Sequence, residues 1–576
     1  MTASGGPRPG AGLADVTALA RDVFGYPELR EVQRRALEPV LAGRDTLAVL
    51  ATGSGKSAVY QLAGLSAGGL TVVVSPLVAL QRDQLRGLQG RRMPDGRPIR
   101  AAQLNATVHV AEARAARAAV AAGELDFLLL GPEQLARPAS RELLATTGRP
   151  CALLVVDEAH LVSEWGFDFR PDYLQLTDAR QLLGDPQVLA LTATAAPPVQ
   201  AEITRRLGMR DPAVVVAGFD RPNIGLAVRA VHGTTTHDKV RGDDVVVDEV
   251  LAGPTPALVY AASRRHCEEL AERFRHLVFT AAPYHAGLPA AERSATQDAF
   301  LSGSLDVVVA TSAFGLGIDK PDVRSVVHAS PPGSLDEYYQ EIGRAGRDGR
   351  PARAVLVFNP ADLRLPRMFA AAARVRDGDV DAVLSALTRA TGPIPLTDLA
   401  QHVGLGTRRA ERVVERLADA GAAVLHDGVV VPHVAEGEQA HRTTERTHDA
   451  EEIRQAVAAS RIDAISYYAE TMHCRRTELL AYFGEQYTPP CGTCDNDRRP
   501  APRTLHGLAR PNVVAAAGQG RAPVDPGSRV EHTTWGGGTV LEADPHQLLV
   551  VFDTVGYRHL TPAALTTGLL RVVAGD

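Results

Sequence analysis

Lys56 ends a glycine-rich turn and has the residue type and spacing of a phosphate-binding loop. The turn, Ala51-Thr-Gly-Ser-Gly-Lys-Ser57, follows an apolar run at 46–50. Main-chain N–H groups of such a turn can surround a triphosphate, while the lysine reaches its terminal phosphates and the serine hydroxyl binds Mg²⁺. The strict pattern has glycine where this chain has Leu50, so a turn that binds nothing stays open as an alternative. The predicted nucleotide contacts are Thr52, Gly53, Ser54, Gly55, Lys56 and Ser57.

Asp157 and Glu158 form an acidic pair directly after the apolar run at 153–156. Such a pair beside a phosphate loop suits the metal and the attacking water of nucleotide hydrolysis. We expect Asp157 to hold Mg²⁺ through water, because Mg²⁺ keeps much of its hydration shell. Glu158 is expected to orient and deprotonate the nucleophilic water. A solvated helix start is the alternative, and it explains the acids but not their combination with Lys56.

Arg344 and Arg347 lie three residues apart in the segment 340–347. On a helix this spacing places both side chains on one face. From across a cleft they can reach a γ-phosphate, as arginine fingers do. A surface helix with ordinary arginines is the alternative in a chain so rich in this residue.

Two stretches of the chain must position these residues, because both alternate short apolar runs with helical segments. The runs lie at 71–74, 127–130, 153–156 and 188–191 in the first stretch, and at 257–260, 307–310, 326–327 and 354–357 in the second. Continuous apolar strands of this kind predict parallel sheets covered on both faces, an α/β fold. Two such domains in tandem form a cleft, and ligands bind beyond the carboxyl ends of their strands.

The rest of the chain predicts smaller modules. Short helices, a longer helix at 407–419 and a hairpin signal at Asp427-Gly428 have the order of a winged helix, with a plain helical spacer as the alternative. The polar residues 435–450 predict a loop, and glycine-marked short strands at 527–572 predict a small SH3-like barrel. The predicted division is 1–12 disordered, 13–215 first α/β domain, 216–375 second α/β domain, 376–435 winged-helix-like domain, 436–497 helical module with a cysteine cluster, 498–526 linker and 527–576 β module.

Composition limits the class of protein. With 45% hydrophobic and 22% charged residues the chain is typical of soluble globular proteins, and no apolar run reaches the ~18 residues of a membrane span. The first residues lack an apolar signal core, and the 5 cysteines are too few for a disulfide framework, so a reducing cytoplasm is expected. A net charge of −6 excludes a wholly basic nucleic-acid binder but leaves room for a local groove of arginines.

The order of segments between about 24 and 362 resembles the RecQ family of superfamily 2 DNA helicases. The match includes the phosphate loop, the box Asp157-Glu-Ala-His160, Leu191-Thr-Ala-Thr-Ala195, Phe219-Asp-Arg-Pro-Asn223, Ala313–Pro321 and Gln340–Gly349. Ser163–Pro171 is the most diagnostic stretch, since it resembles the aromatic-rich loop with which RecQ proteins sense single-stranded DNA and signal to the ATP site. The resemblance implies two tandem RecA-like domains, ATP-dependent unwinding and 3′→5′ translocation.

The resemblance also implies roles for individual residues. Adenine recognition is expected from Tyr26, Arg30 and Gln33. Further residues of the ATP site are expected at Gly317, Asp319 and Gln340. The residues expected to bind DNA or couple it to hydrolysis are Ser75, Pro76, Trp165, Phe167, Phe169, Arg170, Thr192, Thr194 and His285.

Residues 473–497 resemble the RecQ zinc module, which uses four cysteines. Cys474, Cys491 and Cys494 match three of them, and the fourth position holds Asp497. Asp can bind Zn²⁺, although structural sites prefer sulfur and histidine. Zn²⁺ on these residues is therefore expected, and a module that has lost its zinc is the alternative.

The layout of the later modules differs from that of common RecQ proteins, in which a winged helix follows the zinc module. Here the winged-helix-like stretch precedes it, as in the RecQ-like branch called RqlH. The terminal module, with Val530–Val540, resembles the Tudor-like tail of some bacterial superfamily 1 helicases, where such tails can contact RNA polymerase.

We therefore expect a cytoplasmic, nucleoid-associated monomer that hydrolyses Mg-ATP and moves 3′→5′ on single-stranded DNA. It should unwind 3′-tailed duplex in DNA repair or recombination. RNA polymerase or a repair factor is the expected partner of the terminal module, and no membrane is involved. The alternatives are a DNA-stimulated ATPase that remodels complexes without separating strands, and an RNA helicase.

Overall fold

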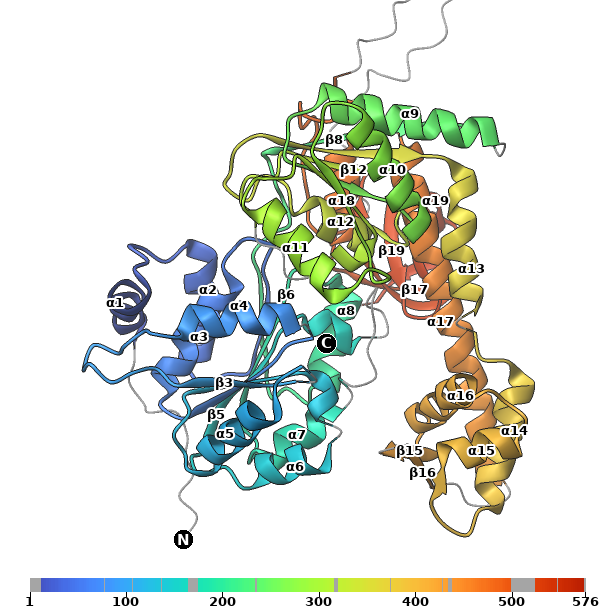
Figure 1. The fold of residues 1–576 in the computed structure, drawn as a ribbon. Coiled ribbons are helices and arrows are strands. Elements are labelled where there is room, and N and C mark those ends of the chain that lie inside the picture. The colour runs from blue at the N-terminus through green and yellow to red at the C-terminus, as the bar shows by residue number, and fades with distance from the viewer. Residues whose placement is uncertain are drawn as a thin grey trace, which may run out of the picture.

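The computed structural model describes residues 12–76, 78–105, 107–135, 137–163, 173, 175–233, 236–314, 320–372, 374–426, 428–433, 438–498, 524–545 and 547–573. Two α/β domains (blue and green in Figure 1) stand next to each other, and a small helical domain and a β module (orange and red) follow. None of the described helices combines the length and the apolar character that a membrane span requires.

The first α/β domain is a parallel seven-stranded sheet of order β3-β4-β2-β5-β6-β1-β7. Val72 and Val74 belong to one apolar cluster and Val73 to another, so the central strands are buried on both faces, as their apolar runs predict. The strands are β1 (Thr46–Val49), β2 (Leu70–Val74), β3 (Ala101–Leu104), β4 (Phe127–Leu130), β5 (Cys151–Val156), β6 (Gln187–Thr192) and β7 (Ala213–Val216). The helices are α1 (Leu13–Phe24), α2 (Glu31–Leu41), α3 (Lys56–Ala67), α4 (Val78–Leu88), α5 (Val110–Ala121), α6 (Pro138–Ala145), α7 (Leu176–Leu182) and α8 (Pro197–Arg206).

The second α/β domain repeats the strand order of the first. Its parallel sheet has the order β10-β11-β9-β12-β13-β8, so β8 to β13 take the places of β1 to β6. The strands are β8 (Ile224–Ala230), β9 (Ala257–Tyr260), β10 (Ala281–Tyr284), β11 (Val307–Ala310), β12 (Ser325–His328) and β13 (Ala352–Phe358). The helices are α9 (Thr236–Ala252), α10 (Arg264–His276), α11 (Ala290–Leu301) and α12 (Leu335–Ile342). The two tandem parallel-sheet domains confirm the predicted fold class.

A helix–strand–helix–helix–hairpin domain follows α13 (Arg364–Ala372). Ala410, Val413, Val414 and Leu417 form one buried face of its longest helix, at the spacing of an amphipathic helix. The antiparallel sheet β14-β16-β15 is inconsistent with a purely helical spacer. The elements are α14 (Asp377–Arg389), β14 (Ile394–Pro395), α15 (Leu396–His402), α16 (Thr407–Asp419), β15 (Ala423–His426) and β16 (Val429–Pro432).

The expected loop at 435–450 is wrong for residues 438–450, which begin the 33-residue helix α17 (Glu438–Glu470). Among the side chains described in this part of the helix, Thr443 and Thr447 are buried although polar, as is Glu451 just after it. A search for apolar periodicity misses such a helix because no apolar residue marks its packed side. Helix α18 (Arg475–Tyr482) follows and adjoins the cysteine cluster.

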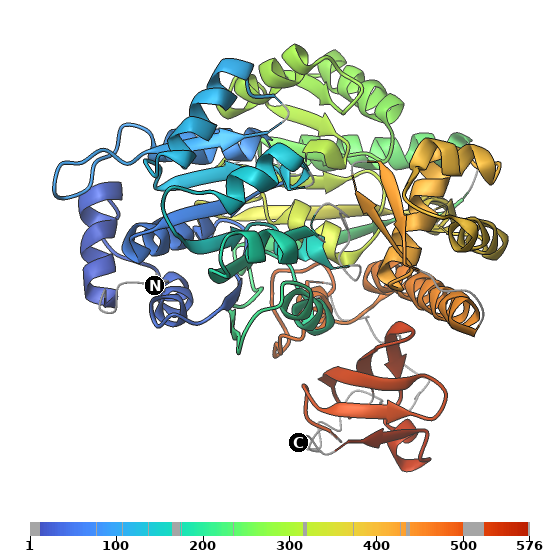
Figure 2. The same ribbon diagram turned by 90° about the horizontal axis from the view of Figure 1, so that it is seen from below.

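The C-terminal module is an antiparallel sheet of order β20-β19-β18-β17-β21. Leu548, Val550 and Phe552 of β19 fill the module's own core, whereas Leu549 and Val551 join the cluster that contains α17 and α18. The module, at one side of the body in Figure 2, is thus packed against the rest of the protein. Since β20 and β21 are the ends of the described sheet, the barrel remains a prediction. The elements are β17 (Arg529–His532), β18 (Gly536–Ala543), β19 (Leu548–Phe552), β20 (Gly556–Leu560), α19 (Ala563–Thr566) and β21 (Leu570–Val572).

Candidate active site

The glycine-rich turn lies between β1 and α3, and α3 begins at Lys56. Gly53 and Gly55 have φ values of +83° and +87°, a region that favours glycine. At Gly55 a Cβ atom would also lie 2.3 Å from the side-chain amide nitrogen of Gln33. The turn therefore aims the N-terminus of a helix at the space above it, the arrangement that binds phosphate.

Two residues predicted to recognise adenine hold the carbonyls of this turn. Gln33 Nε2 donates to the carbonyls of Ser54 (3.1 Å) and Gly55 (3.4 Å), and Arg30 Nη1 donates to that of Gly53 (2.6 Å). The Ser54 N–H donates to the Ala51 carbonyl (3.1 Å), and with the carbonyl oxygens turned toward Gln33 and Arg30, the other N–H groups of the turn can be directed at a ligand. Tyr26 is exposed and stacks on Phe24 with 5.7 Å between ring centroids.

The acidic pair stands at the carboxyl end of β5, next to the turn. Glu158 Oε1 lies 3.8 Å from Lys56 Nζ. Glu158 has φ +50°, an uncommon conformation for a residue with a side chain, and such strain clusters at functional sites. Asp157 is buried and accepts a hydrogen bond from Gln84 Nε2 (3.1 Å). Burial, together with the charge of Glu158, raises the pKa of Asp157 to about 6.

A chain of contacts connects the acidic pair to the end of β6. His160 Nδ1 lies 3.4 Å from Glu158 Oε2 and 3.0 Å from Thr192 Oγ1. Thr192 Oγ1 in turn lies 3.0 Å from the carbonyl of Thr194, to which it donates. Ser75 Oγ lies 3.5 Å from Asp157 Oδ2. Two of the predicted coupling residues, Ser75 and Thr192, therefore touch the acids directly or through His160, and Thr194 contacts Thr192.

Pro76 follows Ser75 at the carboxyl end of β2, but the predicted His285 lies in the other domain. Its Nε2 is 3.1 Å from Glu268 Oε1 of α10, a contact outside the cluster around the acidic pair. Gln84 and His160 were missed as site residues. Their signals were the second turn of the helix after Ser75 for Gln84 and the last position of the acidic box for His160.

The arginine segment of the second domain faces the turn across the cleft. A Cβ atom at Gly53 would lie 3.5 Å from Cγ of Arg347, and one at Gly343 would lie 3.6 Å from Cβ of Thr52. Gln340 and Arg344 are buried beside it. The structure thus brings Arg347 to the phosphate loop. The helix assumed for the arginine spacing, and with it the surface-helix alternative, is wrong, because α12 ends at Ile342 and both arginines lie in the turn after it.

Six predicted site residues lie outside the described residues, namely Trp165, Phe167, Phe169, Arg170, Gly317 and Asp319. The residues that flank the aromatic stretch are described. Ser163 Oγ donates to the carboxylate of Glu202 in α8, and the Tyr173 hydroxyl lies 3.3 Å from the carbonyl of Asp157.

The cysteine cluster is assembled. Donor atoms of Cys474, Cys491, Cys494 and Asp497 all lie within 4.8 Å of one another. Asp497 Oδ2 accepts hydrogen bonds from the main-chain N–H groups of Cys491 (2.6 Å) and Gly492 (3.1 Å), which hold the carboxylate beside the thiols. Three sulfur atoms and one oxygen at this spacing fit a tetrahedral Zn²⁺ site.

Three protein-family descriptions match the chain: DEAD/DEAH box helicase at residues 30–203, helicase conserved C-terminal domain at 244–349, and RecQ zinc-binding at 436–498. The probable ATP-dependent DNA helicase RecS of Bacillus subtilis is 33% identical over 472 residues, 81% of this chain and 88% of that protein. The ATP-dependent DNA helicase RecQ of Haemophilus influenzae is 32% identical over 83% of this chain and 63% of its own length. The structure of the helicase MrfA bound to DNA has a TM-score of 0.50 at 17% identity, over 74% of this chain and 63% of that one, a likeness of fold alone.

Proposed function

The chain belongs to the RecQ family of ATP-dependent DNA helicases, and we propose from this premise that it couples hydrolysis of Mg-ATP to 3′→5′ movement on single-stranded DNA. On this proposal it unwinds duplex DNA with a 3′ tail, in repair or recombination. The chain spans less than two thirds of the Haemophilus influenzae RecQ protein.

The convergence of three charged side chains carries the proposal. Lys56 and Glu158 of the first domain pair at 3.8 Å, and Arg347 of the second domain lies over the same turn. A site divided between two domains closes or opens as the domains move. Hydrolysis in such a site can therefore drive movement along a strand.

The pairing of Lys56 with Glu158 gives a reason for tight control of hydrolysis. A γ-phosphate competes with the carboxylate for the ammonium group, since both are anions. Once released, Glu158 can accept a proton from a water molecule placed in line with the phosphate. Arg344 and Arg347 would then stabilise the charge on the transferred group. Mg²⁺, on Ser57 and through water on Asp157, would neutralise the phosphate oxygens.

The contacts of His160 support a link between DNA and this chemistry. His160 touches both Glu158 and Thr192. A DNA strand that displaces the carboxyl end of β6 would therefore also move Glu158, the residue proposed to deprotonate the attacking water.

A cavity between the second α/β domain, α13 and α17 supports a path for the DNA strand. It has a volume of about 360 Å³ and opens at the carboxyl ends of β9 and β11, where Thr311 and Ser312 line it. Because β9 and β11 take the places of β2 and β4, this edge corresponds to the one that carries Ser75 in the first domain. Phe369 of α13 lines the cavity with 61% of its surface exposed, and an exposed ring of this kind can stack on a base.

The zinc site, the family branch and the oligomeric state are also proposed from the family relationship. We propose that one Zn²⁺ is held by Cys474, Cys491, Cys494 and Asp497. The metal would fix α18 beside β8 of the second domain. The order of modules supports the RqlH-like branch, because the helix–hairpin domain precedes the cysteine cluster. We propose that the protein acts as a monomer.

Strand displacement on duplexes with a 3′ tail, a 5′ tail or blunt ends tests the function. Unwinding that requires ATP and the 3′ tail is expected, and Lys56→Ala should abolish it. DNA-stimulated ATP hydrolysis without strand separation would instead indicate a remodelling translocase. Stronger stimulation by RNA than by DNA of the same sequence would indicate an RNA helicase.

A further inference from the structure

Arg221 lies in the segment that joins β7 of the first domain to β8 of the second. Its Nη1 donates to the carbonyls of Gly343 (3.1 Å) and Thr52 (3.4 Å), and its Nη2 donates to those of Ala345 (2.9 Å) and Gly346 (3.1 Å). One guanidinium therefore holds the phosphate loop and the arginine segment together. All four of these acceptors are main-chain oxygens, so the contacts fix backbone rather than side chains.

A second residue of the same segment secures the turn that carries Arg347. Asn223 Nδ2 donates to the carbonyls of Gly346 (2.8 Å) and Arg350 (2.9 Å). Gly346 has φ +54°, and a Cβ atom there would lie 2.4 Å from Asn223 Nδ2. The turn thus packs against the connecting segment so closely that only glycine fits.

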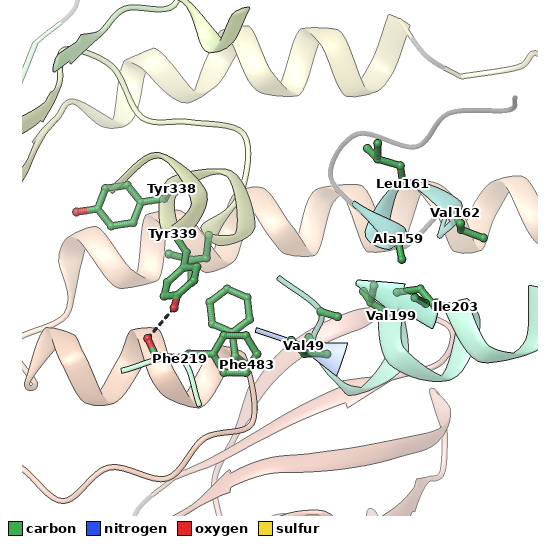
Figure 3. Packing of buried hydrophobic residues seen from close by; sticks show 14 of the residues in the cluster. Val49, Ala159, Leu161, Val162, Val199, Ile203, Phe219, Tyr338, Tyr339 and Phe483 are labelled. Carbon is green, nitrogen blue, oxygen red and sulfur yellow. Dashed lines mark hydrogen bonds between the residues drawn. The ribbon is translucent and has the colours of Figure 1, made fainter. Parts of the chain in front are cut away.

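The residues beside Arg221 in the connecting segment are held by further contacts. The rings of Phe219 and Phe483 stack with centroids 4.6 Å apart, and the Tyr339 hydroxyl donates to the Phe219 carbonyl at 2.7 Å (Figure 3). Asp220 pairs with Arg476 of α18. Because its neighbours make these contacts, the backbone at Arg221 is held in a defined position between the two α/β domains.

We infer that Arg221 is a positioning residue for ATP hydrolysis. It sets the distance between the phosphate loop and the Arg344–Arg347 turn in the closed cleft. Its guanidinium is not placed to touch the transferred phosphate, because both of its terminal nitrogens are occupied by backbone carbonyls. The inference rests on the proposed function, since it concerns the geometry of the same site.

The planar shape of the guanidinium matters to this role. Two nitrogens fixed in one plane can span carbonyls of both domains, whereas a lysine ammonium is a single point on a flexible stem. Misplacing a reacting group by about 1 Å can cost on the order of 10²-fold in rate. Arg221→Ala should therefore lower kcat by about 10–100-fold. The KM for ATP should change by less than about threefold, because the phosphate loop itself remains.

The test compares Arg221→Ala and Arg221→Lys with wild-type protein, using ATP and an excess of oligo-dT. Arg229→Ala is the matched control, an arginine of β8 that pairs instead with Glu249 of α9 at 2.5 Å. Affinities for ADP and for ADP–aluminium fluoride, a mimic of the transition state, are measured on the same samples. We expect Arg221→Ala to weaken the mimic by the same factor as kcat and to leave ADP binding unchanged. Arg221→Lys should fall between Arg221→Ala and wild type.

Two results would overturn the inference. One is a kcat for both Arg221 variants equal to that of wild type and Arg229→Ala. The other is an equal loss of affinity for ADP and for the mimic, which would show a general structural defect. If the alanine variant does not fold, the lysine variant decides by the same two criteria. Wild-type protein without ATP hydrolysis would refute the proposed function instead.

Discussion

Replacing Asp157 by asparagine should stabilise the nucleotide-free protein above pH 6 while stopping ATP hydrolysis. Asp157 is only 4% exposed and lies beside Glu158, and these surroundings raise its pKa to about 6. An aspartate in an unfolded chain has a pKa of about 3.9. The folded protein therefore holds this proton more tightly than the unfolded chain does.

The sign of the effect follows from that difference. Below about pH 4 the carboxyl group is neutral in both states and costs nothing. As pH rises from about 4 to 6 the unfolded state is favoured by ionisation, and the full penalty of about 3 kcal/mol applies above pH 6. Asparagine avoids this penalty but has one acceptor oxygen fewer. It would lose one hydrogen bond, for example the one from the main-chain N–H of Glu158 (3.0 Å), at a cost of about 1 kcal/mol. The net gain is about 2 kcal/mol at pH 8 and below about 1 kcal/mol at pH 5.

Thermal unfolding of nucleotide-free protein measures this gain. For a domain of the size of the first α/β domain, about 1 kcal/mol shifts Tm by roughly 2–4 °C. The Asp157→Asn variant should therefore unfold roughly 4–8 °C higher than wild type at pH 8. Asp45→Asn is the control, because Asp45 is buried in a 2.9 Å ion pair with Arg180 and its loss should destabilise at both pH values. The reasoning is refuted if Asp157→Asn is no more stable than wild type at pH 8, or gains equally at pH 5.

Three further outcomes are expected. Glu158→Gln should bind ATP normally and hydrolyse it about 10²–10⁴-fold more slowly, in single-turnover assays with a matched nucleotide titration; an unchanged rate would rule out its role as base. Phe369→Ala should weaken the binding of oligo-dT, measured by fluorescence anisotropy, by about 1–3 kcal/mol. Met368→Ala is the control and should leave the affinity unchanged, because Met368 is exposed but does not line the cavity. Equal losses of affinity in the two variants would contradict base stacking by Phe369. Asp497→Cys should slow the loss of Zn²⁺ to a chelator, since thiolate is the softer ligand, and metal-free wild-type protein that is folded and active would argue against the zinc site.

The sequence predicts the centre of the site well because parallel strands impose it. Thr192 ends β6, Asp157 directly follows β5, and Lys56 begins the helix after the turn that follows β1. The carboxyl ends of these parallel strands meet at one edge of the sheet. The same logic accounts for Ser75 after β2. The pattern of the strands and the residues of the turns are therefore sufficient to predict that these side chains lie close together.

Other contacts depend on how whole domains pack, which no local pattern contains. The segment Phe219–Asn223 belongs to the motifs that resemble the family, but its spacing does not show that Arg221 joins the backbones of the two domains. Helix α17 was missed in part because Thr443 and Thr447 cover its packed side. The docking of the C-terminal module did have a signal, since the continuous run Leu548–Phe552 is that of a strand buried on both faces.

Helix α17 connects the second α/β domain with the helix–hairpin domain and the C-terminal module. At 1.5 Å per residue its 33 residues extend roughly 50 Å. It packs against α12 of the second domain, α14 and α16 of the helix–hairpin domain, and β20 of the terminal module. A rotation of the second domain by about 10° would move a point roughly 50 Å away by roughly 9 Å. A cavity of about 540 Å³ lies between α8, α16 and α17, so the helix–hairpin domain is not packed tightly against the first α/β domain there. A rotation of the second domain would therefore be amplified along α17 and displace the helix–hairpin domain by the larger distance.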